Sequence, residues 1–145
     1  MTESHAPVLL VEDNPLDLDL TRRAFARRRL QNPILVARDG EEALDFVFCR
    51  GSFASRPADP PLVILLDIKL PKVDGLEVLR QVRADTSTRH VPVVMMTSSR
   101  EGPDIQTSYE LGANAYVVKP LSFSEFSEAV RRIGMFWILT NEPLV

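Results

Sequence analysis

The stretch Leu62-Val63-Ile64-Leu65-Leu66-Asp67 decides how the rest of the chain is interpreted. It follows Pro60-Pro61, and its five consecutive branched apolar residues predict a strand that is buried on both faces of a sheet. The run ends in a carboxylate, and open α/β sheets bind their ligands beyond the carboxyl ends of the strands. Taken alone, Asp67 is best explained as a residue that caps a turn. The other strand ends must decide between these two interpretations.

Length and composition favour one soluble globular domain. A chain of 145 residues with 45% hydrophobic and 26% charged residues has the usual composition of a folded protein. The net charge of -3 argues against a nucleic-acid-binding protein, although a local basic face stays open. Cys49 is the only cysteine, and the first residues lack the features of a signal peptide. No apolar run approaches the ~18 residues of a membrane span, so we expect a cytoplasmic protein.

Four more apolar runs alternate with segments of helical periodicity. The predicted strands are 8–11, 33–37, 62–67, 91–97 and 115–118, and the predicted helices start near residues 15, 41, 75, 102 and 123. Five strands that alternate with five helices predict an α/β fold with a doubly wound parallel sheet and helices on both faces. The flavodoxin-like strand order 2-1-3-4-5 fits a unit of this size. We expect a single domain over 1–145, with a long loop at about 51–61 and a C-terminal helix extension at about 134–145.

Two segments carry more specific expectations. In the first helix, predicted to run to about Leu30, Leu16, Leu20 and Ala24 lie four residues apart and should share a face. Either a solvated helix face or a docking surface for an acidic partner explains the basic cluster of this helix, Arg22, Arg23, Arg27, Arg28 and Arg29. The loop at 51–61 exceeds the ~2–6 residues usual between a helix and a strand, and we expect it to be a mobile surface loop.

Polar residues stand at the ends of four predicted strands: Glu12-Asp13, Asp67, Thr97 and Lys119. In the predicted topology these ends share one rim of the sheet. Carboxylates suit Mg²⁺, which keeps several waters for an incoming phosphate, while Lys119 and Thr97 supply a charge and a hydroxyl for phosphoryl oxygens. Each residue has an ordinary explanation as a turn acid, a strand cap or a surface lysine. Their joint placement predicts that Asp67 attacks phosphorus and becomes an aspartyl phosphate.

These segments resemble the receiver domains of two-component response regulators. The resemblance covers nearly the whole chain through VLLVED (8–13), LLDIKLPKVDG (65–75), VMMTS (94–98) and GANAYVVKP (112–120). It implies Asp67 as the phosphoacceptor, with Glu12 and Asp13 as the acidic metal site for Mg²⁺. It also implies the main-chain carbonyl of Lys69 as a further metal ligand. The Glu-Asp pair is a common variant in such families and leaves this role intact.

The resemblance also implies a switch. Thr97 and Lys119 would contact the phosphoryl group, a cis peptide bond would precede Pro120, and Tyr116 would reorient when Thr97 moves. From the residues alone, Tyr116 could equally be a half-buried core tyrosine. Lys69 and Ser99 flank the site and could set how fast the phosphoryl group is lost.

The narrower resemblance concerns partners. The long loop and the tail 136–142 look like those of single-domain regulators that work with bacterial and cyanobacterial phytochrome kinases. This implies a light-regulated sensor histidine kinase, a bacterial phytochrome, as phosphodonor, docking near the first helix. Too few residues follow Ser122 for an effector domain, so output would come from the receiver surface. The apolar run 135–139 would be covered either by the protein's own core or in a homodimer through the C-terminal helix region.

Three other functions fit the sequence less well. A metal-dependent aspartyl phosphohydrolase, the main alternative, typically carries a second acid two residues after the nucleophile, where this chain has Lys69, and no cap-sized insertion is present. The hypothesis of a nucleotide-binding module has less support, because the acidic segment 12–15 stands where such a module has a Gly-rich turn after its first strand. A degenerate receiver is disfavoured by the complete set of acids, Thr97 and Lys119. We therefore expect a signalling switch rather than an enzyme, one that catalyses its own phosphotransfer and slow autodephosphorylation.

Overall fold

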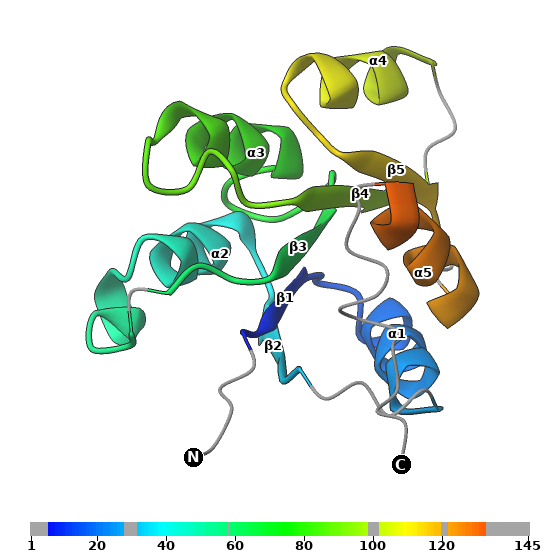
Figure 1. Cartoon of the computed structure of the whole chain (residues 1–145), viewed down its shortest axis with the longest axis horizontal. Coiled ribbons are helices and arrows are strands. Elements are labelled where there is room, and N and C mark those ends of the chain that lie inside the picture. Colours follow the sequence, from blue (N-terminus) through cyan, green and yellow to red (C-terminus); the bar gives the residue numbers. More distant parts are fainter. Residues whose placement is uncertain (1–5, 28–31, 58, 99–101, 120–121, 133–145) are drawn as a thin grey trace.

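One five-stranded parallel sheet forms the centre of the protein, with strand order β2-β1-β3-β4-β5 (Figure 1). The computed structural model describes residues 6–27, 32–57, 59–98, 102–119 and 122–132. The strands are β1 (Val8–Val11), β2 (Ile34–Ala37), β3 (Val63–Asp67), β4 (Val93–Thr97) and β5 (Ala115–Val118). The predicted α/β class and strand order are therefore confirmed.

The three central strands are buried along their whole length, as expected of a parallel sheet covered on both faces. β1 lies between β2 and β3, and its pairing with β3 sets Val8 against Val63 and Val11 against Leu66. On the other side of β3, Asp67 pairs with Met96 in β4. This register brings the ends of β1, β3 and β4 to the same edge of the sheet.

Helices cover both faces of the sheet. They are α1 (Pro15–Arg27), α2 (Gly40–Val47), α3 (Gly75–Ala84), α4 (Gly102–Glu110) and α5 (Phe123–Arg132), with a short 3-10 helix η1 at Gly51–Phe53. α1 and α5 lie on one face and α2 and α3 on the other, while α4 lies beside β5 (Figure 1). None of the helices in the described ranges has the length and apolar character that crossing a membrane requires. The expected C-terminal extension at 134–145 lies outside the described residues.

Leu16 and Leu20, which were expected to share a face of α1 with Ala24, do not pack on the core. Leu16 is 75% exposed and Leu20 is 50% exposed, whereas Leu18 and Phe25 are buried. The reason is the aromatic contact between α1 and α5, in which the ring centroids of Phe25 and Phe126 are 4.7 Å apart. Packing of Phe25 against α5 turns the other face of α1 toward solvent. Ala24, the third residue of the predicted face, is only partly buried against the same core.

The loop at 51–61 contacts α2 through its described residues, and its expected mobility stays a prediction. Arg56 Nε donates a hydrogen bond to the Phe46 carbonyl at 2.7 Å, and the guanidinium lies 4.1 Å from the centroid of the Phe46 ring. Phe53 adds an edge contact to the same ring at 5.2 Å. An aromatic residue of the preceding helix therefore holds the loop through a cation–π contact, which length and composition did not reveal.

Candidate functional site

Glu12 and Asp13 follow β1, and they differ in their surroundings. Glu12 is 1% exposed, and its N–H donates to the Ala37 carbonyl at 2.9 Å, which continues the pairing with β2. Its Oε2 accepts a hydrogen bond from the Asn14 N–H at 3.1 Å. Asp13 is exposed. The pair therefore consists of one inner carboxylate fixed by main-chain contacts and one outer carboxylate open to solvent.

Asp67 ends β3, and it is 5% exposed. Its Oδ1 accepts a hydrogen bond from the Lys69 N–H at 3.2 Å. The Gly75 N–H donates to the Ile68 carbonyl at 2.7 Å, so the first residue of α3 closes against the main chain next to Asp67. A Cβ at Gly75 would lie 2.0 Å from the Asp67 carbonyl oxygen, so this close approach requires glycine.

Glu12, Asp13 and Asp67 form a group of acids that fits a divalent cation. Each offers one carboxylate oxygen, and these three oxygens lie within 4.8 Å of one another. Three negative charges this close repel one another unless a positive charge is added. Hard oxygen donors, one of them on the exposed Asp13, suit Mg²⁺ or Mn²⁺, which keep bound waters. The described residues therefore meet the chemical requirements of the predicted metal site.

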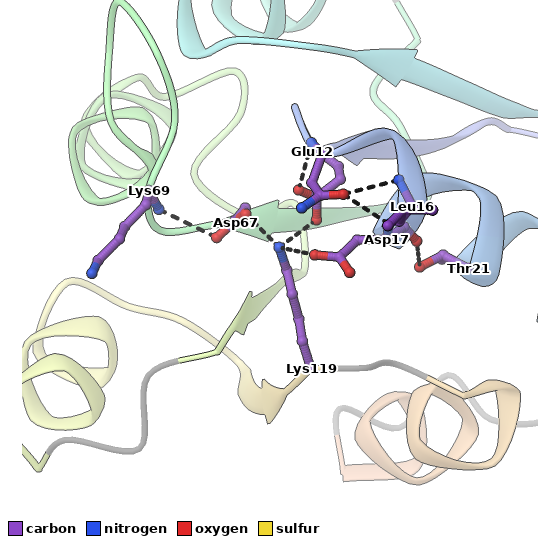
Figure 2. A network of polar contacts seen from close by, with 8 residues as sticks. Glu12, Leu16, Asp17, Thr21, Asp67, Lys69 and Lys119 are labelled. Carbon is purple, nitrogen blue, oxygen red and sulfur yellow. Dashed lines mark hydrogen bonds and ion pairs between the residues drawn. The ribbon is translucent and has the colours of Figure 1, made fainter.

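Lys119 follows β5, and its ammonium is the positive charge at this group of acids. Its N–H donates to the Thr97 carbonyl at 2.8 Å, which fixes its main chain beside β4. The Nζ atom lies 2.6 Å from Glu12 Oε1, 2.6 Å from Asp67 Oδ2 and 3.0 Å from Asp17 Oδ2 (Figure 2). Burial would lower the pKa of Lys119, but the hydrogen bonds to Asp67, Glu12 and Asp17 outweigh it and raise the pKa above its ordinary value. The side chain therefore stays an ammonium.

Burial has the opposite consequence for Glu12. It raises the pKa of the Glu12 carboxyl from 4.5 to about 7, and the negative charge of Asp67 adds to this rise. The hydrogen bonds from Lys119 and the Asn14 N–H act in the other direction without cancelling it. A second cation near Glu12 would favour its ionised form. A bound cation would thus be compatible with Glu12 as an ionised oxygen ligand.

Thr97 and Tyr116 lie in the neighbouring strands β4 and β5. Thr97 is the last residue of β4 and is 1% exposed. Tyr116 pairs with Met95 in the sheet register, and it is half-buried against the core beneath α2 and α3. The half-buried environment is the one that the residues alone suggested for Tyr116. Its reorientation stays a prediction.

The structure gives less information on Lys69, Ser99 and the peptide bond before Pro120. The side chain of Lys69 is exposed, and only its N–H contacts Asp67. The role of its carbonyl as a metal ligand stays a prediction. Ser99 and the peptide bond before Pro120 involve residues outside the described ranges.

Asp17 is the residue at this site that the sequence interpretation missed. It lies in the first turn of α1, and its carboxylate reaches Lys119, 102 positions away in the chain. The Asn14 side chain at the start of α1 accepts hydrogen bonds from the Leu16 and Asp17 N–H groups at 2.9 and 3.2 Å. The available signal was an acid in the first turn of a helix that directly follows an acidic strand end.

Comparison with known proteins gives the family. A model of the response regulator receiver domain matches residues 8–131. The chain is 39% identical over 135 residues to the probable methanogenesis regulatory protein FilR2 of Methanothrix harundinacea, which covers 92% of this chain and 84% of that protein. It is 34% identical over 140 residues to response regulator Rcp1 of Synechocystis sp., which covers 95% of this chain and 94% of that protein.

Solved structures agree with this family. The bacteriophytochrome response regulator AtBRR is similar with a TM-score of 0.87 and 55% identity, over 97% of this chain and 100% of that chain. The Mn²⁺-bound form of Rcp1 is similar with a TM-score of 0.77 and 33% identity, over 97% of this chain and 99% of that chain. The chain belongs to the response regulator receiver domain family.

Proposed function

We propose that this receiver domain accepts a phosphoryl group on Asp67 from a sensor histidine kinase, with Mg²⁺, and signals through its own surface. The observation that carries the proposal is the Lys119 ammonium, which lies 2.6 Å from Asp67 Oδ2 beside a group of three acids. A carboxylate with one oxygen at an ammonium and a metal-binding group next to it has the partners that a phosphorylated aspartate needs.

Each residue has a defined task in this reaction. An Asp67 oxygen attacks phosphorus, forming the O–P bond while the bond between phosphorus and the donor breaks. Glu12, Asp13 and Asp67 would hold the cation, together with the Lys69 carbonyl that the family implies. When bound, Mg²⁺ would neutralise charge on the phosphoryl oxygens. Lys119 and Thr97 would contact these oxygens, and Thr97 with Tyr116 would carry the change to the surface.

The oxygen donors of the site suit several divalent cations, and we propose Mg²⁺ as the one that binds. Rcp1, a relative, has been crystallised with Mn²⁺, which supports a divalent cation at this kind of site. Both ions prefer oxygen ligands and retain waters. Isothermal titration calorimetry (ITC) of the protein with MgCl₂ tests this choice, and absence of binding at millimolar Mg²⁺ would contradict it.

An aspartyl phosphohydrolase is not favoured as a second function. The position two residues after Asp67 is Lys69, whose exposed side chain supplies no second acid. Membership of the receiver family also supports a switch rather than an enzyme that acts on separate substrates.

The test of phosphorylation uses a small acyl phosphate donor. The protein is incubated with this donor and Mg²⁺, and intact mass spectrometry should find one phosphoryl adduct. Asp67→Asn should remove the adduct, because the amide cannot act as the nucleophile. Glu110→Gln, an exposed change of similar size in α4, is the control and should label like the wild type. Equal labelling of Asp67→Asn and wild type would refute the proposal.

The proposed phosphodonor is a bacterial phytochrome histidine kinase in the cytoplasm. The support is the similarity to AtBRR, a bacteriophytochrome response regulator, at 55% identity. The docking surface proposed on α1 includes exposed Leu16, Leu20, Arg22 and Arg23. Exchange of Arg22 and Arg23 for Glu should slow transfer from the kinase and leave labelling by an acyl phosphate unchanged. Equal transfer rates would count against this docking surface.

A homodimer through the C-terminal helix region is also proposed. Its support is the apolar run 135–139 in the sequence. These residues lie outside the described ranges, so the support comes from the sequence alone. Light scattering after size-exclusion chromatography measures the mass in both phosphorylation states. A strict monomer at high micromolar concentration in both states would exclude the dimer.

A further inference from the structure

The carboxylate of Asp17 shares the Lys119 ammonium with Glu12 and Asp67, but it comes from a different part of the fold. Its Oδ2 lies 3.0 Å from Lys119 Nζ, and its side chain is 29% exposed. Figure 2 shows the carboxylates of Glu12, Asp17 and Asp67 all directed at the ammonium. Among the described residues, the group that could hold a metal comprises Glu12, Asp13 and Asp67, without Asp17. Asp17 is thus a partner of the lysine and not of the proposed cation.

The main chain at Asp17 is fixed independently of Lys119. Its N–H donates to Asn14 Oδ1 at 3.2 Å, and its carbonyl accepts a hydrogen bond from Thr21 Oγ1 at 2.8 Å. An acid in the first turn of a helix is also favoured by the helix dipole. The Asp17 carboxylate therefore starts from a main-chain position that a shift of the lysine would not disturb.

A divalent cation and the ammonium would compete for the same two carboxylates. Lys119 Nζ lies 2.6 Å from an oxygen of Glu12 and 2.6 Å from an oxygen of Asp67, and both acids belong to the proposed metal site. A cation that binds there would weaken both contacts of the ammonium. Asp17 offers the ammonium a third carboxylate, which the cation does not require.

We propose that Asp17 is a positioning residue that keeps Lys119 at the site when a divalent cation replaces the ammonium at Glu12 and Asp67. The inference rests on the proposed metal site. Asp17 makes cation binding easier, since the displaced Lys119 ammonium retains one charge-assisted hydrogen bond. It also keeps the lysine next to Asp67, where the phosphoryl group would arrive.

The test is a double-mutant cycle in which MgCl₂ is titrated calorimetrically into the full chain. Asp17→Asn should weaken Mg²⁺ binding about fivefold when Lys119 is present, and less than about twofold in a Lys119→Gln background. Asp17→Glu keeps a carboxylate within reach of the ammonium and should bind within about twofold of the wild type. The matched control is Asp19→Asn, which removes the same charge from the same helix at an exposed pair with Arg23, and it should change the affinity less than about twofold.

Three results would overturn the inference. An equal loss in both Lys119 backgrounds would mean that Asp17 acts on the cation directly. An unchanged affinity in Asp17→Asn would mean that it does not act, and Asp17→Glu as weak as Asp17→Asn would exclude the carboxylate as the cause. Failure of the wild type to bind Mg²⁺ would overturn the proposed metal site as well. By contrast, normal Mg²⁺-dependent labelling of Asp67, together with no coupling between Asp17 and Lys119 in the Mg²⁺ affinities, would refute only the role of Asp17.

Discussion

Helices α3 and α4 both follow a strand that ends at the site, yet they are held very differently. α3 begins at Gly75 against the main chain beside Asp67, and its Val78, Leu79 and Val82 are fully buried. Of the nine residues of α4, all of which the structure describes, only Ser108 is buried. The difference shows that the fold fixes the element next to the proposed phosphoacceptor and leaves the element after Thr97 near the surface.

This difference matters for signalling. Elements with little burial open at low free energy, so they are the ones that a local change can shift. α4 follows β4, whose last residue Thr97 is a proposed phosphoryl contact. We therefore expect α4 to open at a lower free energy than α3. Four substitutions in α3, in α4 and at the contact between them test this difference.

The largest effect is expected from core truncation in α3. Leu79 is 0% exposed, and Leu79→Ala should lower the free energy of unfolding by about 3 kcal/mol through the cavity it creates. The matched change Ile105→Ala in α4 removes a partly buried side chain and should cost about 1 kcal/mol. Urea denaturation measures both values. Equal losses would show that α4 is as firmly packed as α3.

The second prediction concerns the side chain that joins the end of α3 to the chain after α4. Arg83 donates to the carbonyls of Gly112 at 2.9 Å and Val91 at 2.6 Å, and to Asn114 Oδ1 at 2.8 Å. Arg83→Met keeps much of the apolar stem but removes these three hydrogen bonds, so it should lower the free energy of unfolding by about 2 kcal/mol. Amide hydrogen exchange should rise around Gly112 more than around Val78. Unchanged exchange at Gly112 would mean that Arg83 does not hold the end of α4.

The third prediction tests the start of α3. Asp74 caps this helix by accepting a hydrogen bond from the Glu77 N–H at 3.0 Å. Asp74→Ala should cost about 1 kcal/mol, while Asp74→Ser should retain most of the stability because serine also caps helices. Urea denaturation of the three proteins checks this order. An alanine variant as stable as the serine variant would show that the cap is dispensable.

The smallest effect is expected on the outer surface of α4. Tyr109 is 45% exposed, and Tyr109→Ala should change the free energy of unfolding by no more than about 0.5 kcal/mol. A loss above about 1.5 kcal/mol, beyond the usual range of surface changes, would mean that α4 is anchored through this ring. Thermal denaturation followed by circular dichroism is sufficient for this comparison.

The sequence was sufficient to predict the fold because each central strand is a continuous apolar run. It was also sufficient to place Glu12, Asp13, Asp67 and Lys119 at one rim, since parallel strands bring their carboxyl ends together. Both predictions depend on local patterns and on topology alone. They needed no knowledge of how the side chains pack.

The features that were missed depend on contacts between distant segments. The spacing of Leu16 and Leu20 does not show which side of α1 packs on the core, because that side is set by the contact between Phe25 and Phe126. Asp17 was missed because its contact with Lys119 spans 102 positions. The anchoring of the loop by Arg56 depends in the same way on the ring of Phe46. Such contacts follow from tertiary packing, which periodicity does not encode.

The pairing of β1 with β3 restricts where this chain can gain or lose residues. Val11 lies opposite Leu66, so the next step along both strands brings Glu12 level with Asp67. An insertion of one residue within either strand would turn the following side chains to the other face and separate these two acids. Differences in length are therefore tolerable between the strands, as in the loop at 51–61, and not within them. The number of residues in a strand is as much a requirement of the site as the identity of its acids.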